Sequence, residues 1–254
     1  MDTVDEVPPG INLFTNRLRA NSFGGEAPAY DAHRPRYPDG MIDELLTQGA
    51  RLVLDVGAGT GIASQQFAER GADVLAVEPD ARMAAVARLK GIPIELATFE
   101  RWEPAGRSFD LVVFAASFHW VDPAVALPKV RTVLRAGGRL ALLWNRLVPT
   151  SPTREDFAAI YGDYMDADAT PAHHDLADLV ATLSAHGYTV EHHIYPLGFH
   201  YTRDQWLDYA FTHANHLILP AAQAAELRER LADRIGAEGV TLGGDALVIV
   251  ATPD

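Results

Sequence analysis

Residues Leu52 to Ile62 read LVLDVGAGTGI. The apolar run at residues 52–54 is too short for a helix and is typical of a buried strand. Asp55 follows, and glycines then stand at the alternate positions 57, 59 and 61. Glycine adopts positive φ and has no Cβ, so the backbone can turn sharply and a ligand can lie against it. With a helix expected over residues 63–70 and closed by Gly71, this strand–turn–helix unit predicts the nucleotide-binding half of a doubly wound α/β fold.

The glycine spacing distinguishes between kinds of nucleotide. A dinucleotide site needs the pattern G-x-G-x-x-G, and here the position of the third glycine holds Ile62. We therefore expect an adenosine ligand with an amino-acid tail rather than a pyrophosphate. A second strand over residues 74–77 ends at Glu78, about 20 residues past the first glycine, where an acidic side chain accepts hydrogen bonds from ribose hydroxyls.

The segments VLDVGAGTG and VLAVEPDARM together resemble the S-adenosylmethionine-dependent methyltransferases of the Rossmann-like class. The resemblance covers residues 50–145 and is looser outside them. It implies an α/β, Rossmann-like, doubly wound fold, with a mostly parallel seven-stranded sheet and helical lid insertions. It also implies S-adenosyl-L-methionine as the cofactor and S-adenosylhomocysteine as the product. Further strands are expected at residues 94–97, 111–115, 140–144, 188–201 (as a hairpin-like edge) and 246–251.

Three regions are expected along the chain. Residues 1–40 form an N-terminal arm over the cofactor, residues 41–145 form the cofactor-binding core, and residues 146–254 complete the sheet and supply a helical substrate lid. The pattern Thr202-x-x-Gln205 is a capping box, which predicts a helix over residues 202–216. Pro220 begins a last helix over residues 221–235.

The resemblance also implies which residues bind the cofactor. In the arm, Tyr30-x-x-x-Arg34-Pro35-x-Tyr37-Pro38 is similar to a segment of trans-aconitate-methyltransferase-like proteins that folds over the cofactor. There the arginine pairs with the methionine carboxylate, and the alternative is an arginine that pins a loop to the sheet. Phe99 departs from the alanine usual in the family, and Met83 has the alternative of an ordinary core methionine. The cofactor-binding residues expected are Tyr30, Arg34, Asp55, Gly57, Ala58, Gly59, Gly61, Glu78, Pro79, Met83, Thr98, Phe99, Ala115 and Ala116.

The methyl acceptor is expected beside the fourth strand. His119 follows that strand and is the first choice for a general base, because its ordinary pKa suits neutral pH. The alternative is a histidine that holds a loop or contacts the cofactor. His213 is the second choice, because it recurs with aromatic residues at three- and four-residue steps on one face of the expected helix; a packed helix with histidines at its margin is the alternative. The substrate-binding residues expected are Phe118, Trp120, Trp206, Tyr209 and His216.

Composition limits the partners. The net charge of −13 argues against nucleic acid, whose affinity comes largely from Lys and Arg on phosphates. No apolar run approaches the ~18 residues of a membrane span, and the acidic N-terminus is not a signal peptide. The chain has no cysteine, and its adjacent histidine pairs do not match metal-ligand spacing. We expect a cytoplasmic monomer or homodimer that acts on a small molecule, without nucleic acid, membrane or metal.

Three functions remain open at this point. The first is methyl transfer to O, N or C of a small molecule, with a carboxylate or a phenol or enol as acceptor. The second is a non-catalytic protein that binds S-adenosylmethionine, because the glycine loop and Glu78 serve binding alone. The third is a nicotinamide-dependent oxidoreductase, which Ile62 disfavours.

Overall fold

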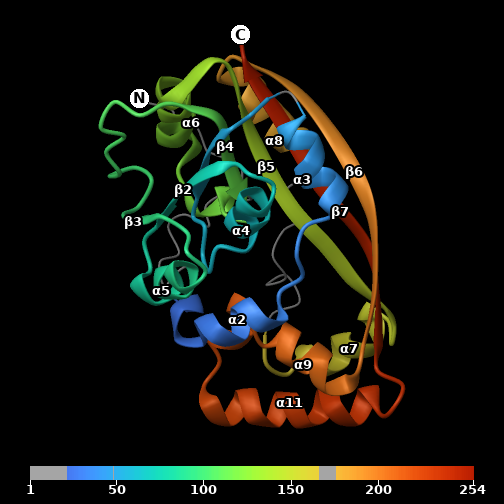
Figure 1. Cartoon of the computed structure of the whole chain (residues 1–254). Coiled ribbons are helices and arrows are strands. Elements are labelled where there is room, and N and C mark those ends of the chain that lie inside the picture. The colour runs from blue at the N-terminus through green and yellow to red at the C-terminus, as the bar shows by residue number, and fades with distance from the viewer. Residues whose placement is uncertain (1–21, 48, 166–175) are drawn as a thin grey trace, which may run out of the picture.

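The computed structural model describes residues 22–47, 49–165 and 176–254, and its centre is one seven-stranded sheet (Figure 1). The strand order is β3-β2-β1-β4-β5-β7-β6. Neighbouring strands from β3 to β5 are parallel, whereas β7 runs antiparallel between β5 and β6. This confirms the expected α/β sheet. The strands are β1 (Leu52–Val56), β2 (Asp73–Glu78), β3 (Ile94–Leu96), β4 (Phe109–Ala115), β5 (Leu134–Ser151), β6 (Tyr188–Tyr201) and β7 (Val240–Pro253).

Helices connect these strands and begin at recognisable caps. Asp80 and Asp122 cap α5 and α6 through their carboxylates, and Thr202 forms the expected capping box at α9. Among the described residues no helix is long and apolar enough to cross a bilayer. The helices are η2 (Phe23–Glu26), α2 (Ala27–His33), α3 (Asp39–Leu46), α4 (Ile62–Glu69), α5 (Ala81–Leu89), η3 (Phe118–Trp120), α6 (Pro123–Val133), α7 (Arg154–Tyr161), α8 (Leu176–Ala185), α9 (Arg203–Ala210), α10 (Ala214–Leu217) and α11 (Ala221–Ile235).

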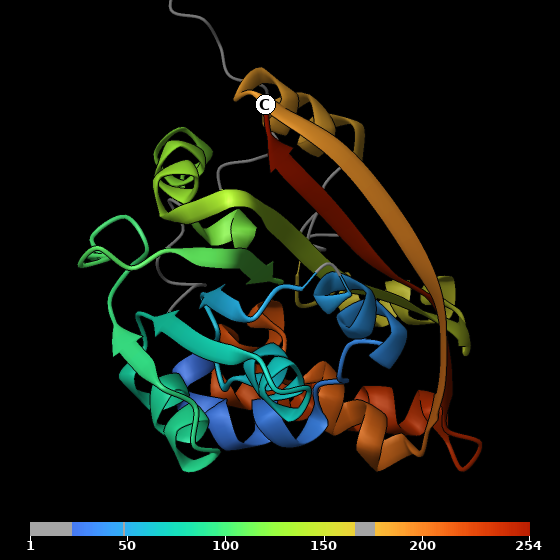
Figure 2. The ribbon, with the colours of Figure 1, turned by 45° about the horizontal axis from the view of Figure 1, so that its top comes forward.

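The sheet has a hydrophobic core on each face, because successive side chains of a strand point to opposite faces. Leu54 of β1 belongs to the cluster that includes side chains of α6 and α8, whereas Val53 belongs to the cluster that includes those of α3 and α4. Figure 2 shows these helix pairs on opposite sides of the sheet. The continuous apolar run of β4, residues 111–114, is fully buried, as expected of a parallel strand covered on both faces.

A third cluster lies where β5, β6 and β7 extend beyond the other strands. It joins side chains of these three strands to α7, α9 and α11, with Phe157, Trp206 and Leu227 among its buried members. Figure 1 shows the three helices gathered at the end of the long strands, next to α2. We call α7, α9 and α11 of this cluster, together with α10, the lid helices.

Several sequence predictions differ from the structure. The strands expected at residues 140–144 and 246–251 are longer, since β5 and β7 pair with each other over most of their length. The helix expected over residues 202–216 is two helices, because the Thr212 hydroxyl donates to the Tyr209 carbonyl oxygen at 2.6 Å and His213 has extended backbone. Such local side-chain bonds compete with helix continuation. The edge at residues 188–201 is one continuous strand paired with β7, not a hairpin of its own. The arm over residues 1–21 and the pair His173-His174 lie outside the described residues.

Candidate active site

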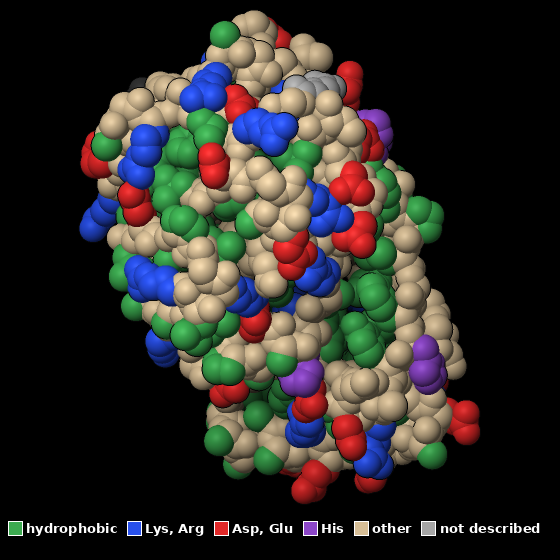
Figure 3. All heavy atoms as spheres, viewed as in Figure 1, with side chains coloured by type: hydrophobic (Ala, Val, Ile, Leu, Met, Phe, Trp, Pro, Cys, Tyr) green, Lys and Arg blue, Asp and Glu red, His purple; other side chains and the backbone are tan. Residues whose placement is uncertain are grey.

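A cavity of about 1080 Å³ opens at the carboxyl ends of the parallel strands. Its walls come from the ends of β1, β2 and β4, from α2, and from the lid elements α7, α9 and α10. Ligands of open α/β sheets bind at this edge. Figure 3 shows acidic and basic side chains interspersed over one face of the molecule, without a continuous basic surface on that face.

The glycine loop forms the floor of the cavity. Gly57, Gly59 and Gly61 have φ of 66°, 59° and 79°, so the backbone turns as expected. A Cβ added to Gly57 would lie 2.6 Å from the Cβ of Ser117, and one added to Gly61 would lie 3.1 Å from that of Ala87. Glycine is therefore required at Gly57 by both backbone conformation and close approach, and at Gly61 by packing on α5.

Glu78 connects the glycine loop to the start of α5. Its carboxylate accepts hydrogen bonds from the Gly59 amide at 2.8 Å and from the Asp80 amide at 2.9 Å. The side chain is buried, and this burial raises the pKa of Glu78 to about 7. Each carboxylate oxygen retains further lone-pair capacity, so the group can accept additional hydrogen bonds from a ligand in the cavity.

Asp55 takes a different place from the one expected. It is buried behind the loop, where the Ser64 hydroxyl donates to it at 2.6 Å, and it does not belong to the cavity wall. Burial raises the pKa of Asp55 to about 6. The backbones of Gly59 and Gly61 likewise turn beneath the wall rather than forming it. These three residues shape the loop from behind.

Most of the other predicted residues do line the cavity. Phe118 is an exception: it lies in the core, with its ring centroid 5.3 Å from that of Phe114. The predicted residues on the wall are Tyr30, Arg34, Gly57, Ala58, Glu78, Pro79, Met83, Thr98, Phe99, Ala115, Ala116, His119, Trp120, Trp206, Tyr209, His213 and His216.

Arg34 joins the arm to the lid. Its Nε donates to Thr212 Oγ1 at 2.9 Å, and its Nη2 donates to the Thr212 carbonyl oxygen at 3.1 Å. The guanidinium carbon lies 4.9 Å from the ring centroid of Tyr30 and 5.6 Å from that of Tyr209. Arg34 thus pins the arm as the alternative interpretation supposed, but to the lid instead of the sheet.

The two lid histidines are held as neutral imidazoles. His213 Nδ1 lies 3.0 Å from the carbonyl oxygen of Ala210, so this nitrogen carries the proton and Nε2 has the lone pair. Burial, reinforced by the charge of Arg34, lowers the pKa of His213 well below 6.5. Burial and Arg34 also lower the pKa of His216 to about 4. His216 Nε2 contacts the Tyr161 hydroxyl at 3.2 Å.

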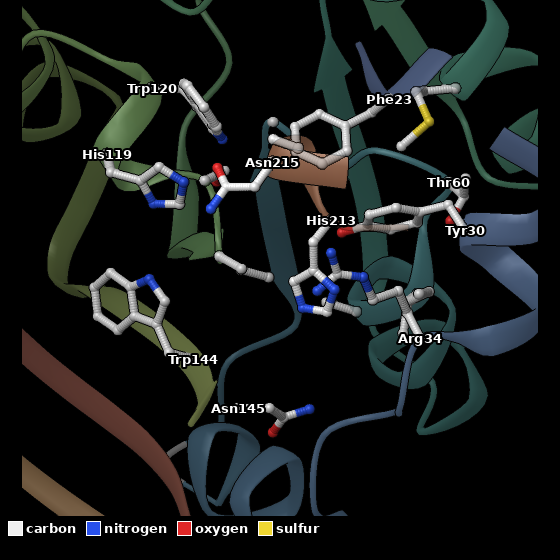
Figure 4. A pocket seen from close by; sticks show the side chains of 18 of the residues that line it. Phe23, Tyr30, Arg34, Thr60, His119, Trp120, Trp144, Asn145, His213 and Asn215 are labelled. Atoms are coloured by element: carbon white, nitrogen blue, oxygen red, sulfur yellow. The ribbon is translucent and has the colours of Figure 1, made fainter. Parts of the chain in front are cut away.

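His119 lies on the opposite wall, in η3 after β4. Its ring centroid is 4.7 Å from that of Trp120. In Figure 4 the Asn215 amide of α10 points toward the His119 imidazole, while Tyr30 and Arg34 lie across the cavity. Among the described residues, no three His, Asp or Glu side chains group to hold a metal ion.

Several wall residues were not among those predicted. Thr60 is buried, and its hydroxyl has no hydrogen-bond partner within the described part of the chain. The position of Thr60 between Gly59 and Gly61 could have predicted from the sequence that it lines the cavity. Trp144 ends the fifth predicted strand and Asn145 follows it, so the strand-end rule also pointed to them. No local signal marked several others, among them Phe23, Phe157, Tyr161 and Asn215.

Comparisons with known proteins agree with this geometry. Residues 54–142 match the family described as "Methyltransferase domain". An uncharacterized methyltransferase of Mycobacterium tuberculosis is 43% identical over 152 residues, which cover 59% of this chain and 61% of that protein. A demethylmenaquinone methyltransferase of Beutenbergia cavernae is 32% identical over 133 residues, 51% of this chain and 54% of that protein. The chain thus spans between one half and two thirds of the length of these curated relatives.

Solved structures share the fold. An S-adenosylmethionine-dependent methyltransferase of Geobacter sulfurreducens, in complex with S-adenosylhomocysteine, aligns with a TM-score of 0.53 at 17% identity, covering 99% of this chain and 100% of that one. One from Thiobacillus denitrificans, in complex with the same molecule, gives 0.53 at 16%, covering 98% and 100%. Residues 54–142 therefore match a methyltransferase domain, and the whole chain shares its fold with these S-adenosylmethionine-dependent methyltransferases.

Proposed function

We propose that this protein transfers the methyl group of S-adenosyl-L-methionine to O, N or C of a small molecule, releasing S-adenosylhomocysteine. One observation carries the proposal: the Glu78 carboxylate, which ends β2, is tied to the glycine loop through the Gly59 amide and faces a large cavity. This arrangement presents acceptors for ribose hydroxyls at the edge where open α/β sheets bind nucleotides.

The residues present fit such a cofactor. Gly57 lies on the cavity wall where the Ser117 side chain leaves no room for a Cβ, and Thr60, on the same wall, has a hydroxyl without a partner among the described residues. Glu78 would hold the ribose, and Met83, Thr98 and Phe99 would surround the adenine. Tyr30 and Arg34 cover the site from the arm, where a guanidinium suits a carboxylate.

The cofactor supplies a methyl group already activated on a sulfonium. The protein therefore chiefly holds the acceptor in line, which alone is worth about 7–11 kcal/mol in well-oriented reactions. His119, on the wall after β4, would take a proton from an acceptor that must lose one. His213 is less suited to this role, because its lowered pKa makes it a weak base.

A second function rests on the same observation. The glycine loop and Glu78 serve binding alone, so a non-catalytic cofactor-binding protein would have the same floor. Ile62 begins α4 and lines the cavity where a dinucleotide site needs glycine, which disfavours a nicotinamide coenzyme. The similarity to a demethylmenaquinone methyltransferase favours catalysis on a small molecule.

Titration calorimetry and a methyl-transfer assay test the proposal. We expect S-adenosylhomocysteine to bind with a stoichiometry of about one and NAD to give no heat. Labelled S-adenosylmethionine is then incubated with panels of carboxylates, phenols and amines. Binding of NAD in place of S-adenosylhomocysteine would refute the assignment, and cofactor binding without transfer to any panel would favour the non-catalytic function.

A further inference from the structure

The lid side of the cavity is walled mainly by rings. We call it the acceptor chamber and define it by Trp144, Phe157, Tyr161, Trp206, His213 and His216. The rings of Phe157 and Trp206 are stacked with centroids 5.0 Å apart, and Tyr161 meets His216 edge-on at 5.5 Å. Flat aromatic walls of this kind favour a flat apolar ligand, because ring pairs add to the free energy of burial.

The acceptor chamber contrasts in charge with the rest of the protein. The chain has a net charge of −13, yet all acidic side chains on the described cavity wall come from the end of β2 and from the segments after β2, β3 and β4. The wall segments of β5 and α7 contribute Arg146 and Arg154 instead, and those of α9 and α10 contribute no Asp, Glu, Lys or Arg. Arg146 is paired with Asp245 at 2.6 Å. A cationic ligand would therefore lose its hydration without finding a carboxylate.

Two buried polar atoms of the cavity wall have no hydrogen-bond partner among the described residues. His216 is about nine-tenths buried, and its Nδ1 has no hydrogen-bond partner among the described residues. Asn145 Oδ1 is likewise buried and unpartnered there. Buried polar atoms are normally hydrogen-bonded, so such atoms on a cavity wall indicate where a ligand's polar group binds. The imidazole of His216 is neutral near pH 7, so it suits a neutral partner better than an anion.

We propose that the methyl acceptor is a flat, uncharged, apolar molecule bearing a hydroxyl group, and that His216 Nδ1 is a hydrogen-bond partner of that hydroxyl. The inference rests on the proposed function and narrows its acceptor class. It sets aside amines that are cationic at neutral pH, because the acceptor chamber offers them no carboxylate. It also sets aside carboxylates, because the uncharged imidazole of His216 gives a carboxylate no ion pair and Arg146 is already paired with Asp245.

Equilibrium dialysis of a matched naphthalene series tests this class. The probes are 2-naphthol, 2-methylnaphthalene, 2-naphthoate and 2-naphthylmethylamine, each with the full chain saturated with S-adenosylhomocysteine. We expect 2-naphthol to bind about fivefold more tightly than 2-methylnaphthalene, because it gains one hydrogen bond. We expect it to bind about tenfold or more tightly than the cationic 2-naphthylmethylamine. Tighter binding of the carboxylate or the amine would overturn the proposal.

Paired variants locate the hydroxyl contact. In His216→Phe, which keeps a ring but loses both nitrogens, the preference for 2-naphthol over 2-methylnaphthalene should disappear while 2-methylnaphthalene binds as before. His192→Phe makes the same change on the exposed face of β6 and should leave the preference at fivefold. An unchanged preference in His216→Phe would refute the contact.

Two controls separate the possible failures. Should His216→Phe fail to fold, the probe series on the unaltered protein still decides the acceptor class. Calorimetry with S-adenosylhomocysteine alone is run first. If that product binds and 2-naphthol shows no preference, the acceptor class is wrong and the proposed function stands; if the product does not bind, the proposed function itself fails.

Discussion

The carboxylate of Glu78 should make cofactor affinity depend on pH near neutrality. Ribose hydroxyls need an ionised acceptor, and burial raises the pKa of Glu78 to about 7. If only the ionised form binds, the apparent Kd scales as 1 + 10^(7−pH), which is about 1.1 at pH 8 and about 11 at pH 6. Titration calorimetry with S-adenosylhomocysteine should therefore show affinity about tenfold weaker at pH 6 than at pH 8.

Glu78→Gln is the matched perturbation. A glutamine amide presents one acceptor oxygen, so either the Gly59 or the Asp80 amide loses its partner and faces a donor. The amide NH2 also leaves a ribose hydroxyl without its acceptor in the complex, and an unmet buried donor costs about 1–3 kcal/mol, so the Kd at pH 8 should rise about 5- to 150-fold. The variant should also bind with equal affinity at pH 6 and pH 8.

The pH dependence of the Kd for S-adenosylhomocysteine distinguishes Glu78 from the neighbouring titratable residues. Asp55 lies behind the loop with its pKa raised to about 6, so it titrates lower and does not face the ligand. His119 does face the cavity. If Glu78→Gln retained the tenfold change between pH 6 and pH 8, another group would be responsible, and the assignment of the ribose acceptor would be refuted.

Three further predictions concern the loop, the base and the core. Gly57→Ala should abolish S-adenosylhomocysteine binding and lower the melting temperature more than Gly71→Ala, because both have φ above +60° but only Gly57 lacks space for a Cβ; equal effects would refute the close approach. His119→Ala should lower turnover about 10²–10⁴-fold with an unchanged Kd for S-adenosylhomocysteine if His119 is the base, and unchanged turnover would exclude that role. Asp55 is stabilising when protonated, so its contribution is complete below its unfolded pKa of about 3.9 and is lost as pH rises through about 6. Glu78, with its pKa raised to about 7, loses stabilisation over the same range, so urea unfolding should show a loss between pH 5 and pH 8 that is about 1.4 kcal/mol smaller in Asp55→Asn than in the unaltered protein.

Local rules predicted the cofactor side well. The positive φ values at the three glycines, the strand ending at Glu78 and the caps at Asp80 and Thr202 each depend on a few neighbouring residues, and the structure has all of them. These rules do not predict the direction in which a side chain points. Asp55 points behind the loop and Phe118 into the core, since packing between distant segments decides both orientations.

The acceptor side depends on contacts between residues far apart in the sequence. The long extension of β5 beyond Trp144 is stabilised by its antiparallel pairing with β7, which begins about a hundred residues later. Phe157 and Trp206 meet only because that extension brings α7 and α9 together. The spacing of aromatic residues along α7 or α9 does not distinguish a ring that faces a ligand from one that faces the core. The acceptor chamber was therefore predictable only in part, from the helix expected over residues 202–216.

Arg34 links the two sides of the site. Its guanidinium binds Thr212, so the arm is closed onto the lid, and its charge is a second cause of the lowered pKa of His213 and His216. A positive charge in a low-dielectric site disfavours protonation of nearby imidazoles. The contact that closes the arm therefore also adds to the burial that keeps His213 and His216 uncharged. An open arm would remove this charge from the lid histidines and let them titrate nearer to 6.5, so closure and selection of a neutral acceptor depend on the same residue.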